Sequence, residues 1–445
     1  MVFVRPRANS HDADTLRHPA TSHDAAEPGA PIPPSAALPQ VAECGAIPGM
    51  SEVPTTGGRV GNPSLLRRLN LVAALGALLD APTLTLRELQ AVVGVSRPTA
   101  EQLLAALVSD RWVEEVAGPA GGRGRPARHF RFRAGAGHVT GMDIGAHKAM
   151  AVVTDLRGRT LAEHRVALDP DLDAPSRLRA AAGAAHACWA KIGLTAGEVT
   201  AVGCGVTGAV RADHRVRDVS SGPTGSGLAT YSLPGFTQVD VALALTEAVG
   251  RPVTVANDVK LAALAEHWKG AAIEHADLVY MFAGHRAGAG VLFSGRVHEG
   301  RHGAAGEIGA LPTLGWSSAM ARLHARGATL AARRKLPPGR EGELVITSAT
   351  RGDEDSLAVL AEVAAVLAKG AAILALAVDP EAVVLGGGMS RGPLFADLFR
   401  RELATLTLFP IEVLVSTLGA ESVALGAARL ALNEVLAELL HVPNA

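Results

Sequence analysis

The spacing of apolar residues changes twice along the chain and divides it into three segments. Residues 1–60 show no apolar periodicity and hold nine of the 26 prolines, which predicts a flexible, proline-rich tail. From Ser64, leucines and valines recur at helical spacing. From His138, short apolar runs end in glycine turns and alternate with longer helical stretches. The expected domains are therefore a tail over 1–60, a mainly helical domain over 61–135 and an α/β region over 136–445.

The segment 61–135 carries the start and stop signals of three helices. Thr85 and Glu88 form a capping box at the start of the second helix, and Ser96 is placed to cap the third. A glycine between these two helices permits a tight turn. Two strands are expected around a loop rich in glycine, arginine and proline, at 112–116 and 128–133. Three helices followed by such a ribbon describe a winged helix-turn-helix.

The third helix and the loop are the candidate DNA-contacting parts. The helix is amphipathic, so its polar face is free to enter a major groove while its apolar face packs. Residues 61–133 hold ten arginines, no lysine and six acidic residues, a net charge of +4 that suits a phosphate backbone. A three-helix module for structure or protein interaction is the alternative. The candidate contacts to double-stranded DNA are Ser96, Arg97, Thr99 and Gln102 on the helix, and Arg123 and Arg125 on the loop, which can enter a minor groove.

The α/β region reads as two similar halves. A strand, a glycine turn and another strand begin near residue 139, and the same order begins again after Asp277. Two such halves place a ligand cleft between them. Strands are expected at 139–145, 149–155, 199–206, 252–255, 278–282, 290–293 and 382–385, with helices at 174–191 and 356–376 and further helices to the end.

Four motifs in this region resemble those of the ROK family, which contains bacterial transcriptional repressors and sugar kinases. They are Gly141-Met142-Asp143-Ile144-Gly145, Val255-Ala256-Asn257-Asp258-Val259, the run from Gly303 to Gly309, and Val384-Leu385-Gly386-Gly387-Gly388. The resemblance implies a two-lobed, actin-like or hexokinase-like ATPase fold. The winged helix-turn-helix resembles the regulator branch of the family rather than its stand-alone kinases.

The resemblance also assigns roles to residues of the cleft. Asn257, Asp258 and Glu307 would contact a sugar, and in a kinase Asp258 would be the base that takes the proton of the attacking hydroxyl. The alternatives are a strand-end turn or helix cap for the Asn257-Asp258 pair and a surface salt bridge for Glu307. Weaker matches to nucleotide-binding positions are Asp143, Gly145, Gly386, Gly387 and Gly388.

The chain departs from the family pattern where phosphate and zinc would bind. Ala146 stands where the first phosphate loop has a second glycine, and 284–288 lacks the threonine and central glycine of the second loop. Ala310 replaces the family's zinc-binding histidine, and the segment after it has no cysteine. The sequence therefore predicts no bound metal, and ATP with Mg²⁺ only if kinase activity is retained.

Composition narrows the setting in which these domains act. The 445 residues are 48% hydrophobic and 19% charged, which excludes a disordered chain. Three scattered cysteines predict a reduced, cytoplasmic protein. Uninterrupted apolar runs fall short of the roughly 20 residues of a membrane span, so no membrane partner is expected.

These observations predict a DNA-binding transcriptional regulator, with a repressor favoured over an activator. Its α/β region forms a homodimer or homotetramer and senses a sugar or sugar derivative. One alternative is an ATP-dependent sugar kinase, favoured by the acidic residues of the cleft. The other is a constitutive regulator whose cleft is vestigial, favoured by the lost family residues.

Overall fold

The computed structural model describes residues 63–118, 127–210, 216, 233–336 and 340–441. Contacts group Gly61–Ala445 into one compact unit. The predicted proline-rich tail and the arginines of the predicted wing, Arg123 and Arg125, lie outside the described residues.

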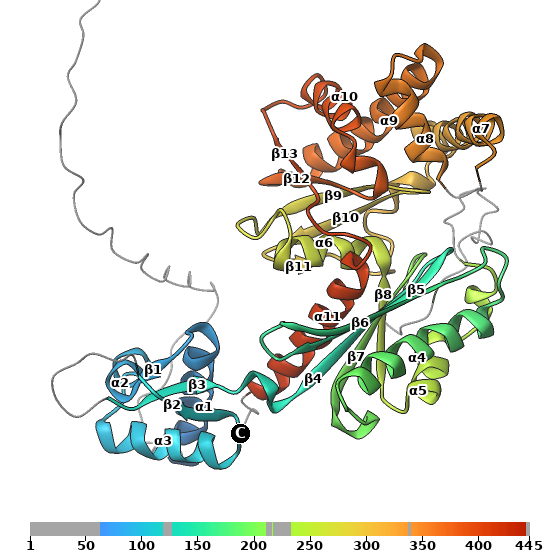
Figure 1. Cartoon of the computed structure of the whole chain (residues 1–445). Coiled ribbons are helices and arrows are strands. Elements are labelled where there is room, and N and C mark those ends of the chain that lie inside the picture. Colours follow the sequence, from blue (N-terminus) through green and yellow to red (C-terminus); the bar gives the residue numbers. More distant parts are fainter. Residues whose placement is uncertain (1–62, 119–126, 211–215, 217–232, 337–339, 442–445) are drawn as a thin grey trace, which may run out of the picture. The chain divides into compact units, whose positions relative to one another are not determined.

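The N-terminal part folds as three helices and a three-stranded sheet (Figure 1). The capping box is present: Glu88 N–H donates to Thr85 Oγ1, and the Glu88 carboxylate accepts from Thr85 N–H. The three predicted helices and the two predicted strands are all present, which confirms the prediction. The elements are α1 (Pro63–Asp80), β1 (Leu84–Thr85), α2 (Leu86–Val93), α3 (Arg97–Ser109), β2 (Val113–Val116) and β3 (His129–Phe132), with the antiparallel strand order β1-β3-β2.

The buried face of α3 is narrower than its set of apolar residues. Leu103, Leu104 and Leu107 of α3 are buried against the other helices and the sheet. Val108, the next residue of the helix, is 40% exposed. One residue further along a helix turns a side chain by roughly 100°, which carries Val108 out of the packed stripe.

The first lobe of the α/β region is built on a five-stranded mixed sheet. The strands are β4 (His138–Ile144), β5 (Lys148–Asp155), β6 (Thr160–Ala167), β7 (Val199–Val206) and β8 (Val253–Asn257), in the order β6-β5-β4-β7-β8. Sequence reasoning missed β6, an edge strand with alternating exposed polar positions. The associated helices are α4 (Ala174–Lys191), α5 (Val241–Val249) and the C-terminal α11 (Ser422–Leu439). Helix α6 (Asp258–Lys269) follows β8 and packs against α11 and the sheet of the second lobe.

The second lobe repeats this topology. Its strands are β9 (Leu278–Ala283), β10 (Ala287–Phe293), β11 (Arg296–Val297), β12 (Ala382–Gly386) and β13 (Glu412–Val415), in the order β11-β10-β9-β12-β13. In both sheets three antiparallel strands are followed by two parallel ones, which confirms the two similar halves. The expectation of helices alone after residue 385 is wrong, because β13 completes the sheet. The helices are α7 (Trp316–Arg334), α8 (Glu341–Thr350), α9 (Glu354–Val378) and α10 (Pro393–Ala404).

Among the described helices, α9 alone is long and apolar enough to cross a membrane. Half of its apolar stretch is buried inside the protein. Helix α9 contains the whole of the predicted helix over 356–376. Leu360, Val363 and Leu367 belong to the buried core of the second lobe. The apolar character of α9 is therefore explained by packing in that core.

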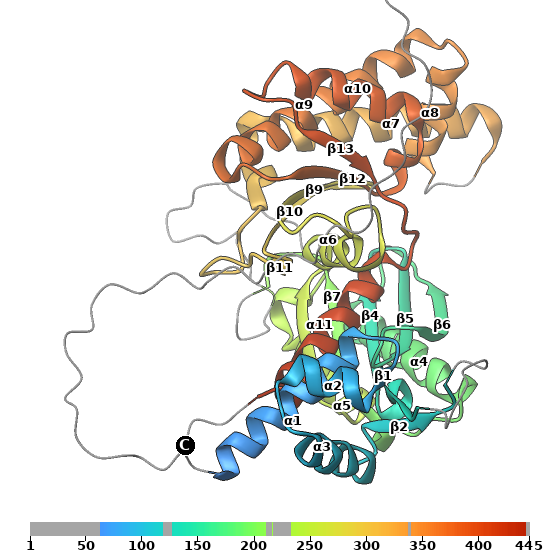
Figure 2. The same cartoon turned by 90° about the vertical axis from the view of Figure 1, so that its left-hand side faces the viewer.

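The last helix returns to the first lobe and packs closely on its sheet. In both views α11 runs along β4 and β7 (Figures 1 and 2). A Cβ added at Gly141 of β4 would lie 1.9 Å from Ala424 O of α11. The glycine is thus required by the close approach of helix and strand, independently of any phosphate contact.

Arg157 ties the turn between β5 and β6 to the N-terminal helices. Its Nη2 donates to Leu78 O and to Ala81 O at the end of α1, each at 2.8 Å. Its guanidinium also lies 5.9 Å from the ring centroid of Phe132. A cation at a helix C-terminus satisfies carbonyls that the helix leaves unpaired.

Candidate functional site

A cavity of about 500 Å³ opens between the two lobes, at the carboxyl ends of their strands. Three acidic residues, Asp143, Asp258 and Glu307, share its lining. Basic side chains from both lobes also face it, namely Lys148, Arg165, Arg286 and Arg391, with His147 and His285. The structure therefore brings together the acidic residues that the sequence placed in one cleft.

Asp258 begins helix α6, and its carboxylate accepts two hydrogen bonds. Thr207 Oγ1 donates to its Oδ2 at 2.7 Å, and Val259 N–H donates to its Oδ1 at 2.8 Å. Burial, together with the charges of Asp143 and Glu307, raises the pKa of Asp258 to about 7, against the hydrogen bond from Thr207, which lowers it. Near neutral pH this carboxyl is thus present in both protonation states, and it can accept or donate a hydrogen bond.

Asn257 forms the N-cap of α6. Its Oδ1 accepts from Lys260 N–H at 3.0 Å, and its Nδ2 donates to Gly208 O at 2.9 Å. The helix-cap alternative that the sequence left open is present in the structure. Asn257 also lines the cavity, so a sugar contact through the second hydrogen of Nδ2 stays a prediction.

Glu307 begins the short 3-10 helix η4 (Glu307–Ala310) and lines the cavity half-buried. Burial raises its pKa, and the nearby charge of Lys260 acts in the opposite direction. Lys260 is itself buried and donates from Nζ to Glu299 O at 3.2 Å and Gly303 O at 2.8 Å. Lys260, which sequence reasoning missed, thereby fixes the loop that presents Glu307.

Asp143 forms an ion pair with a lysine of the adjacent strand. Lys148 Nζ lies 2.7 Å from Asp143 Oδ2, and the carboxylate side chain is 4% exposed. Lys148 also donates to Ala420 O, in the segment before α11. Burial raises the pKa of Asp143, and Lys148 lowers it. The negative charge predicted to face a nucleotide is therefore balanced by a cation of the protein itself.

The turns that replace the two phosphate loops are closed by their own backbone. Gly145 N–H donates to Lys148 O at 2.9 Å, and Gly284 N–H donates to Arg286 O at 3.0 Å. The fully buried Arg177 of α4 holds the first turn from behind, donating to Gly145 O and Ala146 O. Sequence reasoning missed Arg177, because it lies in none of the family motifs. The one signal for it in the sequence was a charged residue in an alanine-rich helix.

The three glycines at the end of β12 and directly after it differ in their surroundings. Gly387 and Gly388 line the cavity. Gly386 is not among the lining residues, and a Cβ added there would lie 2.1 Å from the hydroxyl of Tyr280. The tyrosine of the neighbouring strand leaves no room for a side chain at Gly386, and the predicted nucleotide contact stays a prediction.

The predicted DNA-contacting residues of α3 lie near its N-terminus. Arg97 and Gln102 are exposed, and Arg97 Nε donates to Glu101 at 3.0 Å. Ser96 caps the helix: its Oγ accepts from Thr99 N–H at 3.4 Å and lies 2.9 Å from Thr99 Oγ1. These two hydroxyls therefore already have a structural role in the free protein.

A helix-turn-helix domain is followed by two α/β lobes of repeated topology, with a cleft between them that is lined by acidic and basic residues. This arrangement defines a sugar-kinase-like protein equipped to bind DNA. The sequence comparisons make the assignment specific. Residues 139–434 match the ROK family, and the chain belongs to that family. Residues 69–117 match the IclR helix-turn-helix domain. The two matches together place the chain in the transcriptional regulator branch.

The relatives include both regulators and kinases. A xylose repressor of Caldicellulosiruptor bescii is 22% identical over 408 residues, which are 85% of this chain and 98% of that protein. The bifunctional enzyme NanE/NanK of Brucella melitensis is 29% identical over 297 residues. That match covers 66% of this chain and 54% of the enzyme, so the chain spans about half the length of this relative.

Two solved structures show the same division. A ROK family glucokinase from Streptomyces griseus in complex with glucose and AMPPNP is 27% identical, with a TM-score of 0.53, and covers 66% of this chain and 99% of its own. A ROK family transcriptional regulator, a homolog of the E. coli MLC protein, has a TM-score of 0.62 at 18% identity. The match covers 84% of this chain and 98% of that regulator. The second shows that the fold extends beyond the kinase-like lobes.

Proposed function

We propose that this ROK regulator represses transcription from a double-stranded DNA operator and that a sugar bound in the cleft changes its DNA affinity. The observation that carries the proposal is that one cavity combines retained sugar-contact candidates with altered phosphate-loop turns. The acidic residues predicted to contact a sugar are all present, whereas the turns in the place of phosphate loops are altered.

The part of the cavity that contains Asp258 and Glu307 is suited to bind a sugar. Asp258 and Glu307 offer oxygens that accept hydrogen bonds from vicinal hydroxyls, and they reach the cavity from different lobes. The cavity of about 500 Å³ lies within the size range of small-molecule sites. The related glucokinase was solved with glucose and a related repressor is named for xylose, so neutral monosaccharides are the first ligands to test.

The part of the cavity formed by Asp143 and the turns that replace the phosphate loops argues against phosphorylation of a sugar. Lys148 neutralises Asp143, which weakens that carboxylate as a partner for hydrated Mg²⁺. Ala146 adds a Cβ where a phosphate would approach the backbone, and the turn at 284–288 offers His285 and Arg286 instead of a hydroxyl and a central glycine. We therefore favour sensing without phosphoryl transfer.

A sugar kinase is the second candidate function, and the pKa of Asp258 favours it. A general base is most effective when its pKa lies near the working pH, and Asp258 has a pKa of about 7. An ADP-release assay over a panel of sugars decides between the two functions. Sugar-dependent turnover that Asp258→Asn abolishes would establish the kinase, whereas no turnover with any sugar would exclude it.

Coupling between cleft and operator follows from linkage. A sugar that contacts both lobes favours one arrangement of the lobes. The change in DNA affinity is limited by the difference between the affinities of the sugar for the two arrangements. In a homodimer or homotetramer, two helix-turn-helix domains must match the spacing of two half-sites. A small change in that spacing is enough to release the operator.

The first prediction concerns Glu307. A sugar at 100 times its Kd should stabilise the full-length protein by about 2.7 kcal/mol, a melting shift of several degrees. Glu307→Gln should reduce the affinity at least tenfold, because it removes a charged acceptor. Differential scanning fluorimetry with glucose, xylose and N-acetylmannosamine measures this shift.

Glu402→Gln, on the exposed face of α10, is the matched control and should retain the full shift. If none of the sugars shifts the melting temperature of a protein that still binds DNA, the cleft is vestigial and the regulator constitutive.

A further inference from the structure

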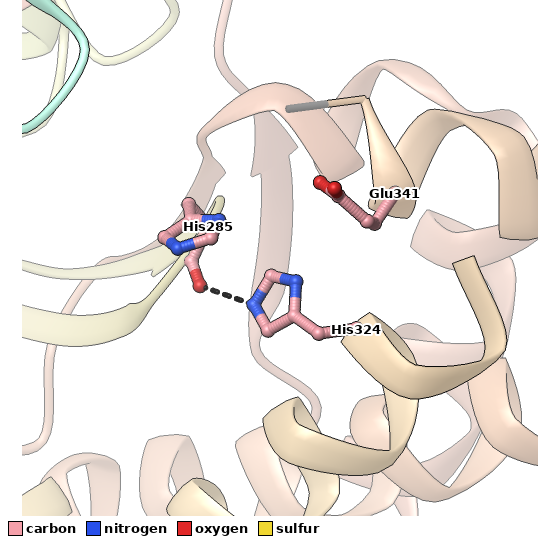
Figure 3. A group of neighbouring side chains, drawn as sticks. All are labelled: His285, His324 and Glu341. Atoms are coloured by element: carbon pink, nitrogen blue, oxygen red, sulfur yellow. Dashed lines mark hydrogen bonds between the residues drawn. The ribbon is translucent and has the colours of Figure 1, made fainter. Parts of the chain in front are cut away.

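Two histidines and a glutamate converge beside the cleft, from three elements of the second lobe. His285 lies on the turn between β9 and β10, His324 on α7, and Glu341 begins α8 (Figure 3). Each residue offers one ligand atom, and these atoms all lie within 4.8 Å of one another. A single ion could therefore contact all three residues.

The hydrogen bonding of His324 determines which of its nitrogens is available. Its Nε2 lies 2.8 Å from His285 O, and a carbonyl can only accept, so Nε2 carries the hydrogen (Figure 3). Nδ1 is then left with a lone pair. That nitrogen is buried, and within the described residues it has no hydrogen-bond partner.

This arrangement is the usual one for a metal-binding histidine. Such a histidine donates its other ring N–H to a carbonyl or carboxylate, which fixes both its tautomer and its orientation. In this protein the orienting carbonyl belongs to His285, so one member of the group positions another. A buried nitrogen without a partner is unfavourable, and a metal ion would satisfy it.

We propose that His285, His324 and Glu341 bind one divalent transition-metal ion, with Zn²⁺ as the best match to the ligands. Two imidazole nitrogens and one carboxylate oxygen form a common zinc ligand set, whereas Mg²⁺ and Ca²⁺ prefer oxygen ligands throughout. Three protein ligands leave a fourth coordination position for water or a cleft ligand. His285 also lines the cavity, so the ion would lie at its edge.

The site differs from the zinc site implied by the family resemblance. That site would use a histidine at position 310 and cysteines in the segment after it, and this chain has alanine and no cysteine there. The proposed ligands instead include the turn at 284–288, which stands in the place of the second phosphate loop. An ion bound there would tie this turn to α7 and α8.

The test uses untagged full-length protein freed of metal by chelation. Zn²⁺ is titrated in competition with a chromophoric chelator, and Co²⁺ is titrated by visible absorption, which reports a tetrahedral site. We expect one equivalent of each metal to bind. His324→Gln and Glu341→Gln should each reduce the Zn²⁺ affinity at least tenfold and remove the Co²⁺ absorption bands.

His302→Gln is the matched control, because His302 is exposed and lies outside the group. It should bind both metals as the parent protein does. The melting temperatures of the metal-free variants show that each is folded, and Glu341→Gln, which keeps the side-chain shape, serves if His324→Gln is destabilised.

Zn²⁺ affinity unchanged in both His324→Gln and Glu341→Gln would overturn the proposal, as would equal binding of Mg²⁺ at the same concentration. Metal binding lost only in His302→Gln would also overturn it. The outcome does not depend on sugar recognition: Glu307→Gln should leave Zn²⁺ binding intact, so failure of either proposal can be recognised separately.

Discussion

At the scale of single residues, the cleft depends on buried and half-buried cations as much as on its carboxylates. Lys148 neutralises Asp143, Lys260 fixes the loop before Glu307, and Arg177 holds the turn at Gly145. Sequence reasoning singled out the acidic residues and missed these three cations. A lysine or arginine has no identifiable role until its acceptors are known, and those of Arg177 are backbone carbonyls that no sequence pattern marks.

Asp258 leads to a prediction on pH and stability. The unfolded chain ionises this carboxyl near pH 3.8, whereas the folded protein retains the proton up to about pH 7. Its contribution to stability is therefore complete below pH 3.8 and is lost as the pH rises through 7. Asp258→Asn has no charge to bury, so its unfolding free energy relative to the parent should rise by about 1–3 kcal/mol from pH 5 to pH 8.

Urea denaturation at a series of pH values measures this difference. Asp171→Asn, in an exposed loop, should follow the parent protein at every pH. Parallel stability curves for Asp258→Asn and the parent would show that the folded protein does not retain the proton of Asp258.

At the scale of elements, the start of α3 combines a structural and a proposed functional role. Ser96 caps the helix, and its hydroxyl also contacts Thr99. Arg97 pairs with Glu101 one turn later, so in the free protein its charge is partly compensated. The cap aligns the first turn of the helix, where the candidate DNA contacts are concentrated.

Ser96 can be tested for the two roles separately. Ser96→Ala should lower the stability of the N-terminal domain by about 1 kcal/mol through loss of the cap. Ser96→Asn keeps a capping oxygen and should restore that stability. Thermal unfolding and DNA binding are measured on both variants.

If the hydroxyl itself contacts DNA, Ser96→Asn will be stable but will still bind more weakly than the parent. If Ser96 acts only as a cap, DNA affinity will follow stability. Equal stability of the parent and Ser96→Ala would contradict the capping role.

At the scale of the whole molecule, the two lobes and the N-terminal helices are joined by specific contacts. Helix α11 follows the second lobe in sequence but packs on the first sheet, through the close approach at Gly141. Arg157 on that sheet binds the carbonyls at the end of α1. These packing contacts and hydrogen bonds connect the second lobe, the first sheet and the DNA-binding helices.

The DNA affinity of the whole chain should depend on the arginines of the predicted wing. Arg123→Ala and Arg125→Ala should each weaken binding to a selected operator and lower the slope of log K against log salt by about 1, because each removes one charge from the DNA contact. Fluorescence anisotropy at several salt concentrations measures the slope. Arg401→Ala, on the exposed face of α10, should leave it unchanged. A footprint and slope unaffected by both wing substitutions would refute the assignment of the wing.

The sequence by itself determined the elements whose signals are local. Helix caps act over three or four residues, as at Thr85 and Ser96, and glycine turns mark the ends of strands, so the winged helices and the repeated halves could be predicted. The motif resemblance similarly placed Asp258 and Glu307 in one cleft.

Only the tertiary structure decided the remaining strands and the partners of the site residues. The strands β6 and β13 lie at sheet edges, where the apolar pattern is weak. Thr207 meets Asp258 across 51 residues, and His324 meets His285 across 39. Contacts at such separations depend on how sheets and helices pack, and no periodicity within the sequence encodes that packing.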